Sequence, residues 1–319
     1  MTTPPNAMPE SPLQSQGLDS QRIAPAPLAP TRPLYWSIRR ELWENRSIYI
    51  APLAAAALGM LAFFINLIFL PRTLRALPGM DPGHQQMMIA MPYGHLVWLL
   101  LPTTFIVGFF YSLDALHGER RDRSILFWKS LPVSDLTTVL SKASIPLVIL
   151  PLLVFAIAVI LHLMMLLLST AVLLLSGGAA TLWAHLPLFQ MELVLLYGLV
   201  VIALWHAPLY AWLLLVSAWA RRATFLWAVL PLLAIGVFEW IVFHTLHFAN
   251  LLHDRLGGFA ADAFSFTTPD GSPVDLHFIP VSLLTPGKFL STPGLWVGLI
   301  FAAIFLAAAV RLRRNREPI

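Results

Sequence analysis

The residues best suited to chemistry in this chain stand close together in one polar segment. It opens with the acidic and basic run Glu119–Arg123, which we expect to be solvated and helical, and continues with the apolar run Ile125–Trp128. Pro132 ends that helix. Ser134 then stands at a helix N-cap position, and Asp135 places negative charge at the positive end of the next helix. The pattern predicts a short helix, a turn and a second helix that continues into a long apolar run.

An apolar face beside arginines has two physical interpretations. In the first, Ile125–Trp128 lies on a membrane surface and is held there by the neighbouring arginines. In the second, the same residues insert into a groove on a partner protein, with aromatic anchors and a basic rim. The residues alone do not distinguish a lipid contact from a protein contact.

Motifs for other chemistries are missing from the sequence. The chain has no G-x-x-x-x-G-K-[ST] loop for nucleotide phosphates, no H-E-x-x-H zinc motif, no nucleophile elbow and no cysteine. We therefore expect a protein that is not an enzyme and that binds no cofactor of its own.

Scattered polar residues permit weaker hypotheses. Three histidines between 244 and 253, and a stretch rich in Met and His from 80 to 95, have metal-ligand chemistry. Interfacial histidines are ordinary and methionine is a common apolar filler, so we predict no metal site. Glu192 and Glu239 are the acidic residues within the apolar runs. Glu239 is a weak candidate for substrate contact, and a structural role near the end of its run is at least as well supported.

The composition indicates whether water or lipid surrounds this chain. Of its 319 residues, 58% are apolar and 11% are charged, and the mean hydropathy is +0.75. Soluble domains carry about 25% charged residues, so we expect an integral membrane protein. The net charge of +4 is too small to indicate a nucleic-acid partner.

Six apolar runs predict an all-α integral membrane protein with six transmembrane helices. A run of about 20 helical residues crosses a hydrocarbon core of about 30 Å. The runs are Ser47–Leu70, Pro92–Leu113, Ile145–Ser176, Met191–Ala220, Ala223–Thr245 and Leu295–Val310.

Basic residues predict the orientation of these spans. With six spans and an inner N-terminus, 16 of the 20 basic residues fall on the inner side. Positive residues stay on the cytoplasmic side during insertion, so both termini are predicted to be cytoplasmic. The one sizeable inner loop is then residues 114–142, which contains the polar segment.

Three outer connections follow from the same spans. They are Pro71–Met91, Gly177–Gln190 and Leu246–Gly294. The last one carries apolar residues interrupted by Pro and Gly, and we expect it to dip into the outer leaflet as broken backbone covered by protein. A surface flap is the alternative.

The start of the chain predicts a tail followed by an entry helix. Residues 1–32 are rich in Pro, Ser, Gln and Thr, which predicts a disordered tail without a signal peptide. From Pro33, an apolar stripe that includes Leu42 lies opposite a polar stripe that includes Arg40 and Glu41. This pattern predicts an amphipathic helix in the inner headgroup layer, and a plain extension of the first span is the alternative.

The polar segment also has a recognisable order of residues. It reads E-R-R-D-R-S-I-L-F-W-K-S-L-P-V-S-D from Glu119 and ends in V-L-S-K at Lys142. This order resembles the first cytoplasmic loop of ABC-2-type transporter permeases, with its charged start, small residue, hydrophobic helix, L-P-V-S turn and Ser-Lys ending. It departs at Asp122–Ser124, where the family commonly has an acidic residue, Gly and Thr. The predicted topology agrees with the family as well, so the resemblance covers about residues 33–316.

The resemblance implies a permease subunit of an ATP-binding cassette exporter in a bacterial cytoplasmic membrane. The residues that it assigns to ATPase coupling are Glu119, Arg120, Arg121, Arg123, Ser124, Leu126, Phe127, Trp128, Leu131, Pro132, Val133, Ser134 and Asp135. It implies as partners a separate ATPase chain that holds ATP and Mg, a second permease subunit that is a copy or a close paralogue, and the lipid bilayer.

The alternative function is a secondary transporter driven by an ion gradient. Such a protein needs broken spans and ionisable residues near the membrane midplane. Pro208 and Pro231 lie within spans, but no acidic or basic residue accompanies them at that depth. The sequence does not identify the cargo under either hypothesis.

Overall fold

The computed structural model describes residues 31–77, 79–122, 124, 133–174, 178–266 and 279–315. The predicted tail therefore lies almost wholly outside the described residues, which begin with helix α1 (Thr31–Glu44). Within the described residues the chain is helical, apart from turns and one isolated bridge between Phe264 and Leu284.

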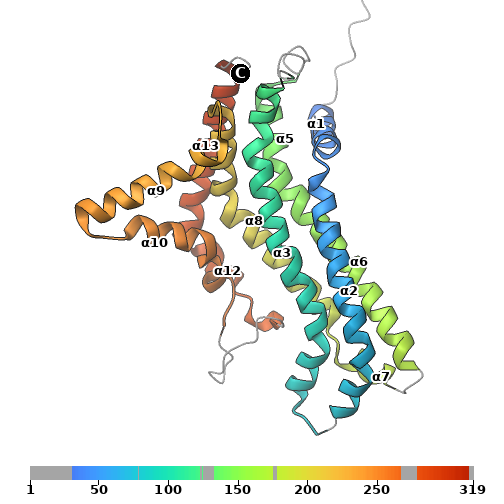
Figure 1. Cartoon of the computed structure of the whole chain (residues 1–319). Helices are drawn as coiled ribbons and strands as arrows, with labels where there is room; N and C mark the ends of the chain where they lie inside the picture. Colours follow the sequence, from blue (N-terminus) through green and yellow to red (C-terminus); the bar gives the residue numbers. More distant parts are fainter. Residues whose placement is uncertain are drawn as a thin grey trace, which may run out of the picture.

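Six helices are long and apolar enough to cross a membrane, as predicted (Figure 1). They are α2 (Ser47–Ala76), α3 (Pro82–Arg121), a continuous helix made of α5 (Asp135–Ser144), η1 (Ile145–Ile149) and α6 (Leu150–Leu174), then α8 (Leu188–Trp219), α9 (Thr224–Phe243) and α13 (Pro293–Asn315). The chain is an all-α, multi-pass membrane protein.

The connection between the first two long helices is much shorter than predicted. Helix α2 continues to Ala76 and α3 begins at Pro82, so most of the expected outer loop 71–91 is helical. Asp81 caps α3 by accepting a hydrogen bond from the Gly83 backbone N–H at 3.0 Å, and Pro82 suits the first helical position. The Met and Gln residues that follow are good helix formers, which explains why the helix starts so early.

The second helix of the polar segment continues into the third span, as predicted. Ser134 caps α5, with its hydroxyl oxygen accepting from the Thr137 N–H at 3.0 Å. At η1 the helix widens into a π turn that contains Pro146. Proline has no N–H for the α-helical ladder, and a π turn accommodates that loss without ending the helix.

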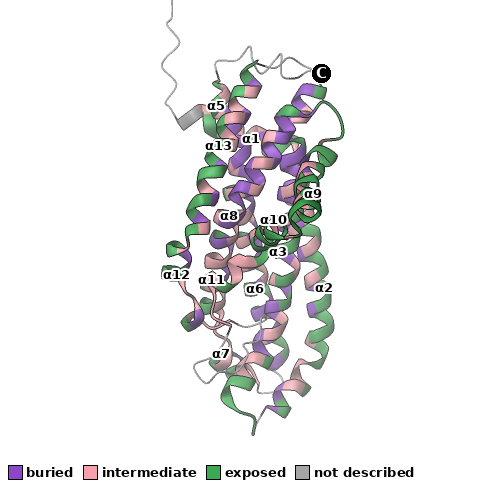
Figure 2. Cartoon of the chain, turned by 90° about the vertical axis from the view of Figure 1, so that its left-hand side faces the viewer, coloured by how far each residue is buried: buried purple, intermediate pink, exposed green. Residues whose placement is uncertain are grey.

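Helix α8 is the most buried of the long helices and lies between α3 and α13. A Cβ at Gly108 of α3 would come within 3.1 Å of the Tyr210 ring on α8, so any other residue here would push that ring away by a few tenths of an ångström. Alanines on α8 likewise meet Ala302 of α13. Small residues let membrane helices approach closely. The outward faces of the long helices, such as that of α2, are exposed and apolar, as expected for contact with lipid (Figure 2).

Helices α9 and α10 (His247–His253) form an arm that leaves the bundle sideways (Figures 1 and 2). Ala223 and His244 flank α9 in the left-handed backbone region, each with a φ of 51°, and make the two sharp corners that set its direction. Within these two fully described helices, Ala228 is the one buried residue. We call residues 224–253 the arm.

The chain after the arm folds back against the middle of α8. This part consists of η2 (Asp254–Gly258), α11 (Phe259–Ala263), η3 (Val281–Leu283) and α12 (Pro286–Ser291). The Trp205 indole N–H donates to the Asp254 carbonyl at 3.2 Å, and the Arg255 guanidinium lies 4.6 Å from the Trp205 ring centroid. One side of this segment therefore packs against α8, while Asp254, Leu256 and Gly257 are exposed, so the predicted dip into the outer leaflet stays a prediction. A short helix, α7 (Ala179–His185), lies in the second predicted outer connection.

Candidate functional site

Four helices bring charged side chains together at one end of the bundle. This is the end where α3 stops, α5 starts and α13 stops, with α1 packed beside it (Figure 1). We call it the charged end. The side chains involved form an ionic network that consists of Arg40, Glu41, Glu119, Asp135, Lys142 and Arg313.

Glu119 of α3 connects the other three helices of this network. Its Oε1 atom accepts from Arg40 Nη2 of α1 at 2.7 Å and lies 3.2 Å from Lys142 Nζ of α5. Its Oε2 atom accepts from Arg313 Nη2 of α13 at 3.3 Å. One carboxylate thus contacts cations from three different helices.

Glu41 forms the second centre of the network and is fully buried. Its two carboxylate oxygens accept from Lys142 Nζ at 2.9 and 3.0 Å, and Oε2 also accepts from the Tyr111 hydroxyl at 2.7 Å. Burial would raise the pKa of Glu41, but the charges of Lys142 and Arg40 and the hydrogen bonds from Lys142 and Tyr111 outweigh it and hold that pKa below its ordinary value. The carboxylate is therefore ionised at neutral pH.

The third acid of the network is Asp135, the first residue of α5. It forms an ion pair with Arg313, so the start of α5 is joined to the end of α13. With this pair the three carboxylates and three cations of the network balance in charge, and Arg40 also pairs with the half-exposed Glu44 outside it, at 3.5 Å. Balance matters because a buried ion without a partner costs several kcal/mol.

Arg120 makes a separate connection between α3 and α8. Its Nη1 atom donates to the carbonyl oxygens of Ala218 at 2.7 Å and Ala220 at 3.2 Å. These carbonyls lie at the end of α8, where the helix itself supplies no donor. The Ser217 hydroxyl oxygen accepts from the backbone N–H groups of Leu116 and His117 at 3.0 and 2.9 Å, which fixes the same two helices to each other.

One expectation about these charged residues is wrong. Glu119 and Arg120 were expected to be solvated, but only 6% and 4% of their surface is exposed, whereas Arg121 beside them is 59% exposed. On the entry helix, Glu41 of the polar stripe is buried and Glu44 is 46% exposed, while Leu42 of the apolar stripe packs against the core. The reason is that counter-charges from other helices replace water around the buried groups.

The predicted coupling residues fall into two groups. Glu119, Arg120, Arg121, Ser124, Val133, Ser134 and Asp135 are described and lie at the charged end. Arg123, Leu126, Phe127, Trp128, Leu131 and Pro132 lie outside the described residues. The structure thus brings the two ends of the predicted coupling loop together through Glu119, Lys142, Asp135 and Arg313.

A second polar pair lies within the long helices. His162 of α6 is 1% exposed, and its Nδ1 atom lies 2.5 Å from Oε1 of Glu192 on α8. Its Nε2 atom lies 3.1 Å from the backbone carbonyl oxygen of Tyr93 on α3. Sequence reasoning considered Glu192 but not His162. A single histidine within a long apolar run was the available signal, since ionisable residues in membrane spans usually have a function.

The weak substrate candidate Glu239 is used within the arm. Its carboxylate accepts hydrogen bonds from the Thr245 hydroxyl at 2.7 Å and from the backbone N–H groups of His247 and Phe248, both at 2.8 Å. These bonds satisfy the first N–H groups of α10, which is a structural role. In the described part of the chain, no three His, Asp or Glu side chains are grouped as metal ligands would be.

Comparison with protein-family models, with curated proteins and with solved structures finds no match for this chain.

Proposed function

We propose that this chain is the permease subunit of an ATP-binding cassette exporter and that a separate ATPase chain docks at the charged end. One observation carries the proposal: the ionic network ties both helices that flank residues 123–132 to α1 and α13. The resemblance of residues 119–142 to the coupling loop of ABC-2-type permeases agrees with it. The partner chain, not this one, would hold ATP and Mg.

The ionic network is suited to transmit a force that a partner protein applies at the charged end. A partner that presses on residues 123–132 displaces the end of α3 and the start of α5. Glu119 and Asp135 pass that displacement to α1 and α13, because each forms an ion pair across a helix boundary. Packed helices joined by such pairs shift between discrete arrangements and do not deform gradually. We infer that α1, α3, α5 and α13 move as one unit, paired with the same unit of a second permease subunit.

We place the charged end on the cytoplasmic side of a bacterial inner membrane. The predicted segregation of basic residues supports this orientation. Helix α1 supports it too, since the Arg39 guanidinium lies 5.2 and 4.7 Å from the ring centroids of the exposed Trp36 and Trp43, a combination suited to lipid headgroups. Because the chain has no cysteine, cysteine introduced at Ser134 should react only from the cytoplasm, and cysteine at His84 only from outside.

Copurification and ATPase assays test the function itself. The chain expressed with the neighbouring reading frames of its genome should copurify with an ATPase and stimulate it in proteoliposomes. Replacing Phe127 and Trp128 by Ala should abolish both effects while insertion stays normal. Replacing the exposed Trp183 and Phe189 by Ala removes the same two ring types at the opposite end and should change neither. Parental transport by the first double variant would overturn the docking role.

A second candidate function, transport driven by a proton gradient, is favoured by the His162–Glu192 pair. A backbone carbonyl only accepts, so the hydrogen bonds assign a proton to His162 Nε2, facing Tyr93. Its Nδ1 atom then faces Oε1 of Glu192 at 2.5 Å, close enough for the two groups to share a proton. A proton-binding pair inside the apolar bundle is the group that a gradient-driven transporter needs.

Transport in proteoliposomes separates the two functions. Uptake or efflux that follows an imposed pH gradient without any ATPase, and that is lost in Glu192→Gln, supports proton coupling. Transport that requires ATP and the ATPase chain, and that ignores the pH gradient, supports the exporter.

A further inference from the structure

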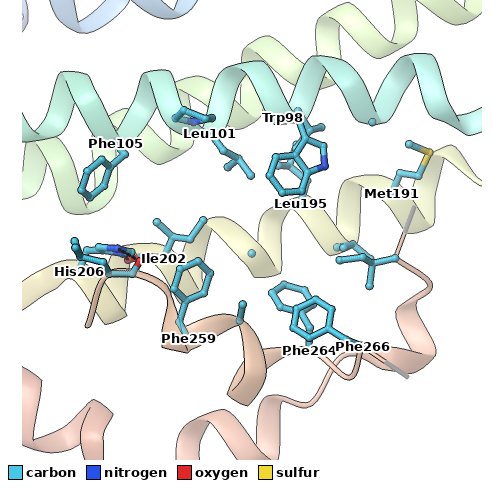
Figure 3. Close-up of a pocket in the computed structure, with 18 residues that line it drawn as sticks. Trp98, Leu101, Phe105, Met191, Leu195, Ile202, His206, Phe259, Phe264 and Phe266 are labelled. Atoms are coloured by element: carbon cyan, nitrogen blue, oxygen red, sulfur yellow. Dashed lines mark hydrogen bonds between the residues drawn. The ribbon is translucent and has the colours of Figure 1, made fainter. Parts of the chain in front are cut away.

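A cavity of about 670 Å³ lies between α3, α8 and the chain that follows the arm (Figure 3). Trp98 and Phe105 of α3 form one wall, Ile202 and His206 of α8 form another, and Phe259 of α11 closes it from the third side. No Asp, Glu, Lys or Arg is among the described residues that line it. No residue of the ionic network lines the cavity, and neither does His162 or Glu192, although Met191 beside Glu192 does.

His206 is the polar side chain in this wall, and its ring nitrogens are already engaged. Nδ1 lies 2.9 Å from the Ile202 carbonyl oxygen and Nε2 lies 3.3 Å from the Leu256 carbonyl oxygen. The imidazole is held edge to face between Phe105 and Phe259, with centroids 5.3 and 5.6 Å away. An occupant therefore meets ring surfaces and alkyl groups and finds no free hydrogen-bonding side chain.

The apolar walls of the cavity favour an uncharged occupant. A charged or strongly polar molecule would lose its hydration and gain no partner, which is costly. Water gains little for the same reason, because cavities with apolar walls stay dry. An uncharged and largely apolar molecule is the class that fits.

The volume of the cavity and the aromatic rings in its walls restrict the class of ligand further. The volume lies within the range of about 300–1,000 Å³ that holds drug-sized ligands. Trp98, Phe264 and Phe266 add further rings to those that hold His206. Rings attract other rings in offset and edge-to-face arrangements beyond the gain from buried area. An aromatic ligand uses this attraction, whereas a lipid acyl chain gains from area alone.

We propose that this cavity binds one uncharged, aromatic and largely apolar small molecule, and that such molecules are the cargo class of the transporter. The cargo role rests on the proposed function. The binding itself does not, because it needs neither an ATPase nor a gradient.

Photolabelling tests the binding directly. Benzophenone, an uncharged aromatic ketone that attaches to nearby C–H groups on illumination, is added to the full chain in lipid nanodiscs. Labelled positions are then mapped by mass spectrometry. Met191 lines the cavity and Met164 is exposed on the outer face of α6. Labelling of Met191 should saturate and be displaced by biphenyl, whereas labelling of Met164 should rise in proportion to the probe and resist displacement.

A matched pair of glycine variants makes the test specific. A Cβ at Gly198 would stand 3.7 Å from the Phe264 ring, at ordinary contact distance, so Gly198→Leu places its side chain in the cavity without a backbone clash. A Cβ at Gly236 in the arm would stand 3.8 Å from Phe248, beside a second hollow between α9 and α10. Gly198→Leu should reduce the saturable labelling of Met191 about tenfold or more, and Gly236→Leu should leave it unchanged.

Two results would overturn the binding proposal. One is Met191 labelling that does not saturate or that survives Gly198→Leu. The other is a phospholipid that stays bound to the purified chain in native mass spectrometry, is absent from Gly198→Leu and is not displaced by biphenyl. Saturable binding combined with no effect of biphenyl on transport or on a copurified ATPase would overturn the cargo role alone. An absent ATPase would count against the proposed function and leave the binding result intact.

Discussion

Replacement of Lys142 by Met tests the ionic network at its centre. Methionine keeps the unbranched shape of lysine and removes the charge. In the structure the Lys142 ammonium lies 2.9 and 3.0 Å from the two oxygens of Glu41 and 3.2 Å from Oε1 of Glu119, and the residue is 2% exposed. The substitution leaves two buried carboxylates that must share the charges of Arg40 and Arg313.

The size of the effect follows from that remaining compensation. Removal of one partner from a buried ion pair destabilises proteins by about 3–5 kcal/mol, because the other charge stays buried. Arg40 still contacts both carboxylates, at 2.5 Å from Glu41 and 2.7 Å from Glu119, so we expect a loss near the lower limit, about 3 kcal/mol. Glu41→Gln should restore part of it, since the double variant no longer buries an uncompensated charge at that position.

Thermal unfolding in detergent, combined with hydrogen exchange of α1, measures the stability lost in Lys142→Met and the part restored by Glu41→Gln. In a double-mutant cycle, Lys142→Met and Glu41→Gln should be non-additive by about 1 kcal/mol or more. Lys288→Met is the matched control, because Lys288 is an exposed lysine that pairs with Asp262 at 3.4 Å, and exposed pairs contribute at most about 1 kcal/mol. Equal losses from Lys142→Met and Lys288→Met, or strict additivity in the cycle, would refute the assignment of a buried network.

The remaining predictions concern Glu41, Ser134 and Glu239. The pKa of Glu41 is held below its ordinary value of 4.5, so its ion pairs stabilise α1 fully at neutral pH and lose that effect as the pH falls through the lowered value. Protection of the α1 amides from hydrogen exchange should therefore persist at pH 5 and disappear in stronger acid. Loss of that protection already at pH 6 would contradict the pairing. Ser134→Ala removes the N-cap of α5 and should destabilise its first turn by about 1 kcal/mol, seen as faster amide exchange at 135–138, whereas Ser134→Asp should preserve the cap. Glu239→Ala removes three hydrogen bonds at the α9–α10 corner and should speed amide exchange there while Met191 photolabelling stays normal; loss of transport without faster exchange would instead indicate a substrate contact.

The features that were predictable from the sequence depend on neighbours along the chain. Apolar runs of sufficient length revealed the six long helices, because each run alone determines whether it can cross lipid. The cap at Ser134 and the continuation of α5 into α6 are also local, since the capping hydroxyl oxygen and the Thr137 N–H that donates to it are three residues apart. The early start of α3 at Pro82 was readable as well, but a loop rich in Met and His was given more weight than its helix-forming residues.

The ionic network was not predictable because its members are far apart in the sequence. Arg40 and Glu119 are 79 residues apart in the sequence, and Glu119 and Arg313 are 194 residues apart. A carboxylate at the end of an apolar run looks the same in sequence whether water or a distant cation surrounds it. Solvation was therefore assigned by default to Glu119 and Arg120, and the burial of Glu41 on α1 was missed for the same reason.

Helix α3 contributes to all three sites: the ionic network, the cavity and the surroundings of the His162–Glu192 pair. Helix α3 carries Glu119 at the charged end, Phe105 and Trp98 in the cavity wall, and the Tyr93 carbonyl that faces His162. Fourteen residues separate Glu119 from Phe105, which is about 21 Å along a helix at about 1.5 Å per residue.

A movement at the charged end therefore reaches the cavity through a continuous helix and needs no chain of side-chain contacts. Pro102 lies within α3 and lines the cavity, and a proline inside a helix removes one backbone hydrogen bond and allows a bend at that level. Gly108, held against Tyr210, fixes α3 to α8 between the two sites. In the proposed exporter, a push on the charged end moves α3 together with the end of α8, to which Arg120 and Ser217 fix it, and the bend at Pro102 allows the wall that carries Trp98 to move relative to the wall that carries His206.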